Sequence, residues 1–483
     1  MNRFMDKQAR GQPKIQRFIQ GGTLLSFGFA LVSGCTLIRS IFIARGISVE
    51  DYGIASALLA VLALIRMTTA VAADKQILQD KDGGSPTFLS GAHSIAVAKG
   101  SLCALFVYLA AEPATLFFDQ PALLPAFQLV AFAPLIAGFC HYDYRAFQRD
   151  GNHRGVVAVT AGPEIIVTLL VIPVLVILQD YRVMIFVCLG LPIAKLVVSH
   201  LVSKRSYRLT VNPRLMLKML KFAWPLMLSG LMLFGIFQGD KFIVGHYFDV
   251  FVLGYYSLAL TLFLLPGQIL HRIYNSLILT QISQAYRGSN SVKDIENLLW
   301  GSLLILAGGY IYFCMSFGAT ILTLVFGEKY AAASAVIPWI VCMVAIRIIR
   351  IAPSILALAL AQTRCELYAN IARSVAIPIA IFSVISGFGL ESVAAAGVFG
   401  EAMALIVGWR ALKFDKAKQP SLRSTLPIAG LFFAALVLST ISVTASQSDA
   451  IFFATNILSV CIILLMCFMY RQQVHNYMVN IRS

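Results

Sequence analysis

Charged side chains inside apolar stretches are the residues of this chain that could do chemistry. Eight basic residues lie within long hydrophobic runs: Arg39, Arg66, Lys99, Lys195, Lys241, Arg347, Arg350 and Arg373. The acids in the same runs are only Glu164, Asp240 and Glu401. An ionisable group in hydrocarbon is costly, so such a group normally faces a cavity or a partner. The surplus of basic groups predicts a binding site for an anion.

Arg347 and Arg350 form the pair best suited to bind a substrate. They lie one helical turn apart on one face of a predicted span. Their distance from its outer end is about 20 Å by helix rise, too far for the side chains to reach water. A guanidinium donates paired hydrogen bonds to phosphate, so this pair predicts a phosphate site. We expect Arg39, Arg66 and Lys241 to bind substrate as well.

Two other interpretations of the basic residues stay open. Lys99, Lys195 and Arg373 lie within reach of a membrane surface, and we expect their side chains to extend to it. The remaining cations could instead pair with the three acids and with backbone carbonyls, only to hold helices together. Three acids cannot neutralise eight cations, which favours a substrate site.

The elements that must position these groups are membrane-spanning helices. Hydrophobic residues make up 59% of the chain and charged residues 12%, against roughly 45–50% and 25% in soluble domains. Apolar runs of about 20 residues, long enough to cross a bilayer as helix, recur along the whole chain. We predict an all-α polytopic membrane protein with fourteen spans: 22–43, 52–73, 89–110, 122–142, 155–177, 182–202, 222–244, 252–270, 298–318, 333–360, 367–387, 391–411, 425–443 and 451–470.

Basic residues outside the spans predict the orientation, because cytoplasmic loops retain Lys and Arg. With the N-terminus inside, the inner segments hold 27 basic residues and the outer segments hold only Arg45, Arg182 and Lys329. We therefore expect both termini in the cytoplasm. The net charge of +16 reflects this topology and contact with anionic lipid heads, so membrane lipids are expected partners and nucleic acid is not.

A weak internal repeat relates the two halves of the chain. Residues 237–260 overlay residues 201 positions earlier, so that Gly254 meets Gly53 and Asp240 meets Arg39. Each copy is an apolar helix that ends in a charge, a short turn with Gly and acidic residues, and a second apolar helix. The pattern predicts two similar bundles. Spans thirteen and fourteen fall outside it.

The expected organisation follows from the spans and the repeat. Asn212 and Pro213 predict a helix start, with basic and apolar residues on different faces. That helix would lie at the membrane interface, or would be a simple connector. In chain order we expect a cytoplasmic segment (1–21), an N-lobe (22–202), an interfacial linker helix (203–221), a C-lobe (222–411), a cytoplasmic loop (412–424), two further spans (425–470) and a cytoplasmic tail (471–483).

Three stretches of this chain are similar to one family of transporters. They are Ala44-Arg45 with Glu50-Asp51-Tyr52-Gly53, the stretch from Asp240-Lys241-Phe242 to Gly254-Tyr255-Tyr256-Ser257, and Phe326-Gly327-Glu328-Lys329-Tyr330. With these and its fourteen spans, the chain resembles the lipid-linked oligosaccharide flippases of polysaccharide export. Their superfamily also holds multidrug and toxin extrusion antiporters. Ile47-Ser48-Val49 replaces the Leu-Gly-Pro usual in the family.

The resemblance implies a fold and a function. Two pseudo-symmetric six-helix lobes would surround a central cavity, lined prominently by spans one, two, seven and eight and open alternately to each side. The substrate would be a polyprenyl pyrophosphate that carries an oligosaccharide repeat unit for exopolysaccharide or O-antigen synthesis. The implied location is the bacterial inner (cytoplasmic) membrane, and a polysaccharide polymerase and a chain-length regulator are further implied partners.

The repeat and the charges together predict a gate. If a two-fold axis relates the halves, Arg39 and Asp240 occupy matching positions near the outer ends of spans one and seven. Their opposite charges would attract when the outer side is closed and separate when it opens. Asp240 is also the acid that we expect to couple transport to an ion. Local pairing of Asp240, for instance with Arg66, is the alternative.

Two other function classes remain as alternatives. A drug or small-molecule antiporter of the same superfamily would favour an acidic cavity, which the charge balance opposes. A membrane glycosyltransferase or polymerase would need catalytic groups on a substantial outer loop, and the predicted outer loops are short. We expect no catalytic residues. The nine Cys show no pairing or metal-ligand spacing, so we expect no disulfide, no metal and no cofactor.

Overall fold

The computed structural model describes residues 14–68, 73–287, 292–362, 364–412 and 471, and within these ranges the regular elements are all helices. Ten of the described helical segments are long and apolar enough to cross a membrane. The predicted all-α, multi-pass fold is therefore confirmed. The count of fourteen spans stays a prediction, and spans thirteen and fourteen lie outside the described residues.

The chain divides into two compact units, Met1–Gly254 and Tyr255–Ser483. The helices of the first unit are α2 (Lys14–Gly46), α3 (Val49–Thr68), α4 (Ala73–Gln79), α5 (Pro86–Phe117), η1 (Pro121–Leu123), α6 (Leu124–Val130), α7 (Phe132–Gly138), α8 (Asp143–Arg149), α9 (Arg154–Leu178), α10 (Arg182–Val202) and α11 (Pro213–Tyr247). The division falls inside α12 (Val250–Arg287). The second unit continues with α13 (Val292–Phe326), η2 (Glu328–Val336), α14 (Ile337–Ile349), α15 (Ile351–Ala359), α16 (Arg364–Ser374), α17 (Ala376–Ile385) and α18 (Leu390–Ala411).

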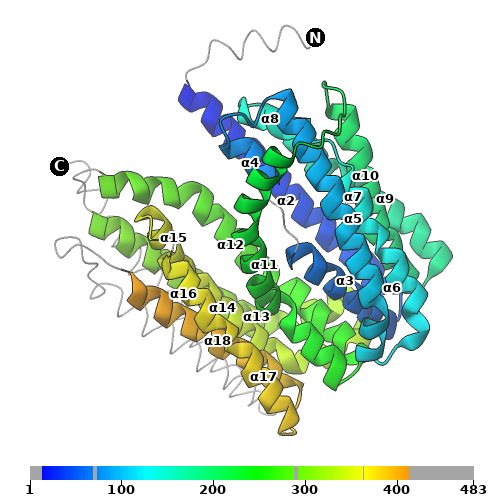
Figure 1. Ribbon diagram of the computed structural model, residues 1–483. Helices are drawn as coiled ribbons and strands as arrows, with labels where there is room; N and C mark the ends of the chain where they lie inside the picture. The colour runs from blue at the N-terminus through cyan, green and yellow to red at the C-terminus, as the bar shows by residue number, and fades with distance from the viewer. Residues whose placement is uncertain (1–13, 69–72, 288–291, 363, 413–470, 472–483) are drawn as a thin grey trace. The chain divides into compact units, whose positions relative to one another are not determined.

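In each unit, a few pairs of helices pack against each other along much of their length (Figure 1). In the first unit α9 packs along both α2 and α10, and α11 packs along α3. In the second unit α18 packs against α14, α16 and α17, so it is surrounded on several sides. A polar side chain on the inner face of α18 must therefore find its partners on these three neighbours.

Three predicted spans are broken in the structure, and each break has the same cause. The fourth, tenth and eleventh spans each contain two α-helices, and the first of the two ends at Val130, Ile349 and Ser374. Each of these residues stands four positions before a proline: Pro134, Pro353 and Pro378. Proline has no N–H for the carbonyl four residues earlier, and its ring clashes with that carbonyl. Each break therefore lies where a proline removes a backbone hydrogen bond, although Pro163 and Pro173 lie inside the continuous α9.

The predicted helix start at Asn212 and Pro213 is confirmed. The Asn212 side chain accepts a hydrogen bond of 3.2 Å from the Leu215 amide, and Pro213 is the first helical residue. The helix then continues to Tyr247 without a break, so the segment 203–221 comprises a non-helical stretch and the first turns of α11. Likewise α2 runs from Lys14 into the first predicted span as one helix.

Glycines related by the sequence repeat meet in the first unit. A Cβ atom added to Gly53 would lie 1.6 Å from the carbonyl oxygen of Val250, and one added to Gly254 would lie 2.2 Å from that of Val49. Val49 and Val250 stand 201 positions apart, as the two glycines do. The contact is reciprocal, the pattern expected where a two-fold relation makes one surface face its own equivalent. It gives the 201-residue repeat a structural basis.

This contact predicts unequal effects of glycine substitution. Gly53→Ala and Gly254→Ala should each lower the thermal unfolding midpoint in detergent, because backbone oxygens must move and overpacking costs about 1–3 kcal/mol. Gly34→Ala in α2 is the matched control, since a Cβ there meets nothing within 4 Å. Equal midpoints for all three variants would contradict the close contact.

Candidate functional site

A buried carboxylate gathers three arginines in the second unit. Glu401 on α18 is 1% exposed. Its Oε1 accepts hydrogen bonds from Arg347 Nε at 2.7 Å and forms an ion pair with Arg373 Nη2 at 2.7 Å, while its Oε2 accepts from Arg350 Nε at 3.0 Å. We call these four residues the arginine cluster. Both carboxylate oxygens are occupied, which is how a buried charge is stabilised in apolar surroundings.

Local backbone features place these side chains. Arg350 is the residue between α14 and α15, so the break caused by Pro353 lies at the site itself. On the other side, a Cβ at Gly400 would come within 2.8 Å of the Arg373 carbonyl oxygen. The absence of a side chain at Gly400 therefore lets α18 approach α16 closely and brings Arg373 beside Glu401.

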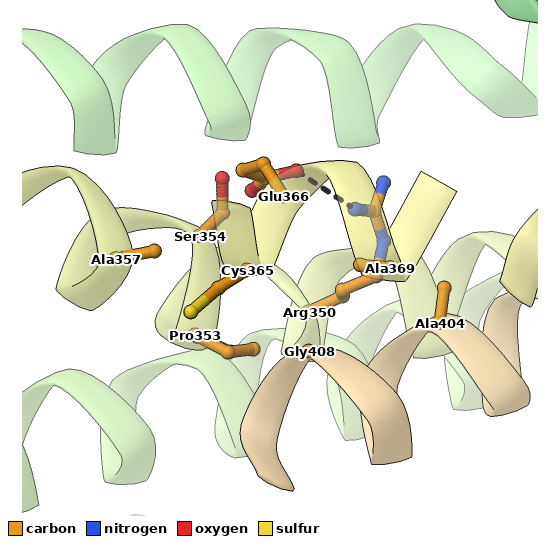
Figure 2. A pocket seen from close by; sticks show the side chains of 9 residues that line it. All are labelled: Arg350, Pro353, Ser354, Ala357, Cys365, Glu366, Ala369, Ala404 and Gly408. Carbon is orange, nitrogen blue, oxygen red and sulfur yellow. Dashed lines mark ion pairs between the residues drawn. The ribbon is translucent and has the colours of Figure 1, made fainter. Parts of the chain in front are cut away.

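The arginine cluster adjoins a small pocket. Figure 2 shows the guanidinium of Arg350 beside the carboxylate of Glu366 in this pocket, with Nη1 and Oε2 3.8 Å apart. The other lining residues are mostly small or apolar: Pro353, Ser354, Ala357, Cys365, Ala369, Ala404 and Gly408. Three guanidinium groups against two carboxylates leave one positive charge in excess, so the arrangement favours an anion.

The structure brings together two of the predicted substrate-binding residues, Arg347 and Arg350, which share Glu401 as partner. The expectation that Arg373 reaches a membrane surface is wrong. It is 5% exposed and binds Glu401, because α16 packs against α18 and turns this side chain inward. Sequence reasoning also missed Glu366. The signal for this pairing was Glu401 itself, since a carboxylate well inside an apolar run needs a cationic partner.

Arg39 in the first unit has a carboxylate partner on a neighbouring helix. Its Nη1 donates to Glu164 Oε2 at 2.7 Å and to Thr168 Oγ1 at 3.4 Å, which links α2 to α9. Arg39 is buried. The interpretation that intramembrane cations pair with acids therefore describes Arg39, and it describes the arginine cluster in part. The gate pair of Arg39 with Asp240 stays a prediction.

The other predicted site residues lie on α3 and α11 of the first unit. Arg66 is exposed in the last turn of α3, while Asp240 and Lys241 are half-buried on α11. The amide of Lys241 donates to Asp240 Oδ1 at 2.9 Å, a contact between chain neighbours. Their roles in substrate binding and coupling stay predictions.

Comparison with known proteins gives a family and a fold. The model of a family described as polysaccharide biosynthesis protein matches residues 42–335. Among solved structures, the lipid II flippase MurJ in an inward closed conformation is similar at 14% identity and a TM-score of 0.72, covering 94% of this chain and 100% of that one. An inward-facing multidrug resistance MATE family transporter of the MOP superfamily is similar at 15% identity and a TM-score of 0.52, covering 80% and 93%.

The eukaryotic MATE transporter AtDTX14 is similar at 14% identity and a TM-score of 0.51, covering 83% of this chain and 97% of that one. A search of curated proteins finds no match to the sequence. The structural similarity extends over most of each chain, so the fold is shared.

A pair of charge swaps distinguishes the two partners considered for Arg39. Arg39→Glu and Glu164→Arg should each destabilise the protein, because breaking a buried ion pair costs about 3–5 kcal/mol. The double swap should recover part of the unfolding midpoint in detergent. Arg39→Asp with Asp240→Arg should recover less, and Arg66→Glu serves as an exposed control. Greater recovery for the Asp240 swap would support the gate pair instead.

Proposed function

Because this chain belongs to the polysaccharide biosynthesis protein family, we propose that it is a flippase for polyprenyl-pyrophosphate-linked oligosaccharide repeat units. It would move them across the bacterial inner membrane by alternating access, for exopolysaccharide or O-antigen synthesis. The pyrophosphate and sugars would enter a polar path through the protein while the polyprenyl chain stays in lipid. This is transport without covalent chemistry, so no residue is assigned a catalytic role.

The arginine cluster is the observation that carries the proposal. A site that only held helices together would need one cation for one carboxylate, whereas Glu401 has three guanidinium partners. An excess positive charge inside a membrane costs free energy unless an anion neutralises it. Phosphate suits the cluster because a planar guanidinium offers paired donors. Arg347 and Arg350 have side chains about 15% exposed, so they remain within reach of a ligand.

The shared fold supports a lipid-linked substrate. The lipid II flippase MurJ has a higher TM-score to this chain than the two MATE transporters named above. In the proposed cycle, the predicted lobes (22–202 and 222–411) would rock about a central cavity. Arg39, Arg66 and Lys241 would contact the substrate phosphates along the path, and Arg39 with Asp240 would close the outer side. A polysaccharide polymerase and a chain-length regulator would act on the product, with both termini of the chain in the cytoplasm.

Export of drugs or other small molecules is the second candidate, since the fold is shared with MATE transporters. A carrier of organic cations would favour a surplus of carboxylates around its substrate. The arginine cluster has the opposite balance, which favours the lipid-linked anion. A membrane enzyme is the third candidate, and the transporter fold speaks against it.

Conservative substitutions test the role of Arg347 and Arg350. Arg347→Lys and Arg350→Lys keep a positive charge for Glu401 but lose the paired donors, so we expect partial loss of polysaccharide export at normal protein levels. The double Ala variant should lose about tenfold or more, since charge-assisted hydrogen bonds contribute about 1.5–3 kcal/mol each. The measurements are complementation of a flippase-deficient strain and transbilayer movement of a labelled polyprenyl-pyrophosphate glycan in proteoliposomes.

Arg410→Ala is the matched control, because Arg410 is an exposed cation in the last turn of α18. It should leave export unchanged. Full export by the double Ala variant would remove the arginine cluster from the transport path. Movement of organic cations in place of the glycan would favour the antiporter.

A further inference from the structure

Glu366 stands apart from the tight contacts of the arginine cluster. The bonds to Glu401 are 2.7–3.0 Å long, but the pair of Arg350 Nη1 with Glu366 Oε2 is 3.8 Å long. A charge-assisted hydrogen bond between such groups measures about 2.7–2.9 Å. The Glu366 side chain is 27% exposed, whereas that of Glu401 is 1% exposed. One carboxylate is therefore fixed, and the other is in loose contact.

The loosely held Glu366 carboxylate lies in front of the unused donors of Arg350. Its Nε donates to Glu401, which leaves the Nη side of the guanidinium directed at Glu366 across the pocket (Figure 2). The Nη side is the part of a guanidinium that can face a phosphate with two donors. Small residues line the rest of the pocket, and Ser354 one turn after Arg350 adds a hydroxyl. A ligand anion on Arg350 would compete for the place of the Glu366 carboxylate.

We propose that Glu366 is a displaceable counterion, which occupies the phosphate site on Arg350 when the site is empty and yields it to the substrate. The proposal rests on the proposed function and adds a specificity device to it. With Glu366 in place, the cluster has one positive charge in excess, and with Glu366 displaced it has two. A monovalent anion gains little from this exchange, whereas a multiply charged pyrophosphate gains more. The same carboxylate returns to Arg350 after transport and helps to expel the phosphate.

Glu366→Gln separates this role from a structural one. The variant keeps the shape of the side chain but removes the competing charge, so it should bind inorganic pyrophosphate about tenfold more tightly in detergent, the scale of a like-charge repulsion removed from a site. Its transport of the labelled glycan should show a lower KM together with a lower kcat, because release is slowed. Glu391→Gln, which removes an exposed carboxylate from the first turn of α18, is the matched control.

The Arg350→Gln variant distinguishes failure of the phosphate site from failure of the displaceable counterion. If it binds pyrophosphate as well as the unaltered protein does, the phosphate site of the proposed function is wrong. If it loses binding while Glu366→Gln behaves like Glu391→Gln, the site stands and the displaceable counterion is wrong. Weaker binding by Glu366→Gln would also overturn the proposal, since it would mean that Glu366 holds Arg350 in place.

A second, independent observation concerns the extended segment 203–212, which we call the strap. Polar side chains of the first unit hold its backbone. Asp143 Oδ2 accepts from the amides of Lys204 and Arg205 at 2.9 and 3.2 Å, and Ser94 Oγ accepts from the Thr210 amide at 2.8 Å. Two strap carbonyls, those of Arg205 and Arg208, bond to histidine rings. The strap is thus attached by side chains, without a helix or sheet of its own.

The histidine contacts require neutral rings. His93 Nδ1 lies 3.2 Å from the Arg208 carbonyl oxygen while its Nε2 accepts from the Tyr142 amide at 3.1 Å. His141 Nε2 lies 3.0 Å from the Arg205 carbonyl oxygen while its Nδ1 accepts from the Asp143 amide at 3.1 Å. A carbonyl needs a donor and an amide needs an acceptor, so each ring carries one proton. A second proton would place an N–H against an N–H.

Charged groups of both signs surround the rings of His93 and His141. The rings lie 4.7 Å apart, and Tyr207 of the strap stacks on His93. Asp143 of α8 favours protonation, while Arg205 of the strap and His200 of α10 oppose it. Tyr142 also stacks near His93, with ring centroids 6.0 Å apart, and Cys140 and Tyr142 flank His141 in the chain. Burial lowers the pKa of His141 below its ordinary value.

We infer that the strap is a proton-sensitive attachment, bound while both histidines are neutral and released when the surrounding pH falls. The bound form takes up protons less readily than the released form, so attachment is complete above the ordinary histidine pKa of about 6.5 and weakens below it. If the predicted orientation holds, the strap would respond to acidification of the cytoplasm.

Hydrogen exchange of the strap tests this inference. The amides of Lys204, Arg205 and Thr210 should be protected at pH 7.5 and exchange faster at pH 5.5, after correction for intrinsic rates. His93→Gln with His141→Gln should remove the pH dependence, because the neutral amide both donates and accepts. His246→Gln at the far end of α11 should keep it. Unchanged protection of the unaltered protein at pH 5.5, or the same pH dependence in the double variant, would overturn the inference.

Discussion

The high cost of an unpaired charge in apolar surroundings is the constraint on which this structure depends. Glu401 satisfies it with three arginines from α14, the break after α14, and α16. Arg39 satisfies it with one glutamate and a threonine. The difference in stoichiometry separates the two sites. A one-to-one pair is complete as a link between helices, whereas three arginines beside Glu401 and the more distant Glu366 leave one positive charge that a further anion can neutralise.

The backbone around the arginine cluster determines which side chains can reach Glu401. An unbroken α-helix through Arg350 would keep its side chain on the same track as Arg347, one turn above it. This is what the structure shows, because the Arg350 amide still donates to the Ile346 carbonyl at 2.9 Å, and from this position Nε of Arg350 meets Glu401 and its Nη1 faces Glu366. Gly400 permits the close approach of α18 to the Arg373 backbone. Helical spacing thus brings Arg347 and Arg350 to Glu401, and Gly400 allows Arg373 to join them.

Helix positions were largely predictable from the sequence, because a span needs a fixed length of apolar residues whatever its neighbours are. The sixth span coincides with α10 (Arg182–Val202), and the twelfth differs from α18 by one residue. The breaks were not predictable from proline alone, since Pro163 and Pro173 lie inside the continuous α9. The partners of Arg347 and Arg350 were not predictable either. Span hydrophobicity does not say which faces of α14, α16 and α18 meet, and Arg373 was placed wrongly for this reason.

The repeat shows a division between what the two halves share and what they do not. The contact of Gly53 with Gly254 is made of backbone atoms, so its shape can persist while side chains around it change. The charged positions related by the same shift have opposite signs, Arg39 against Asp240. A symmetric charge would repel its own equivalent wherever a two-fold relation brought the two positions close, whereas opposite charges could approach. The approach of Arg39 to Asp240 stays a prediction, and in the structure Arg39 meets its need for a counterion at Glu164, within its own half of the repeat.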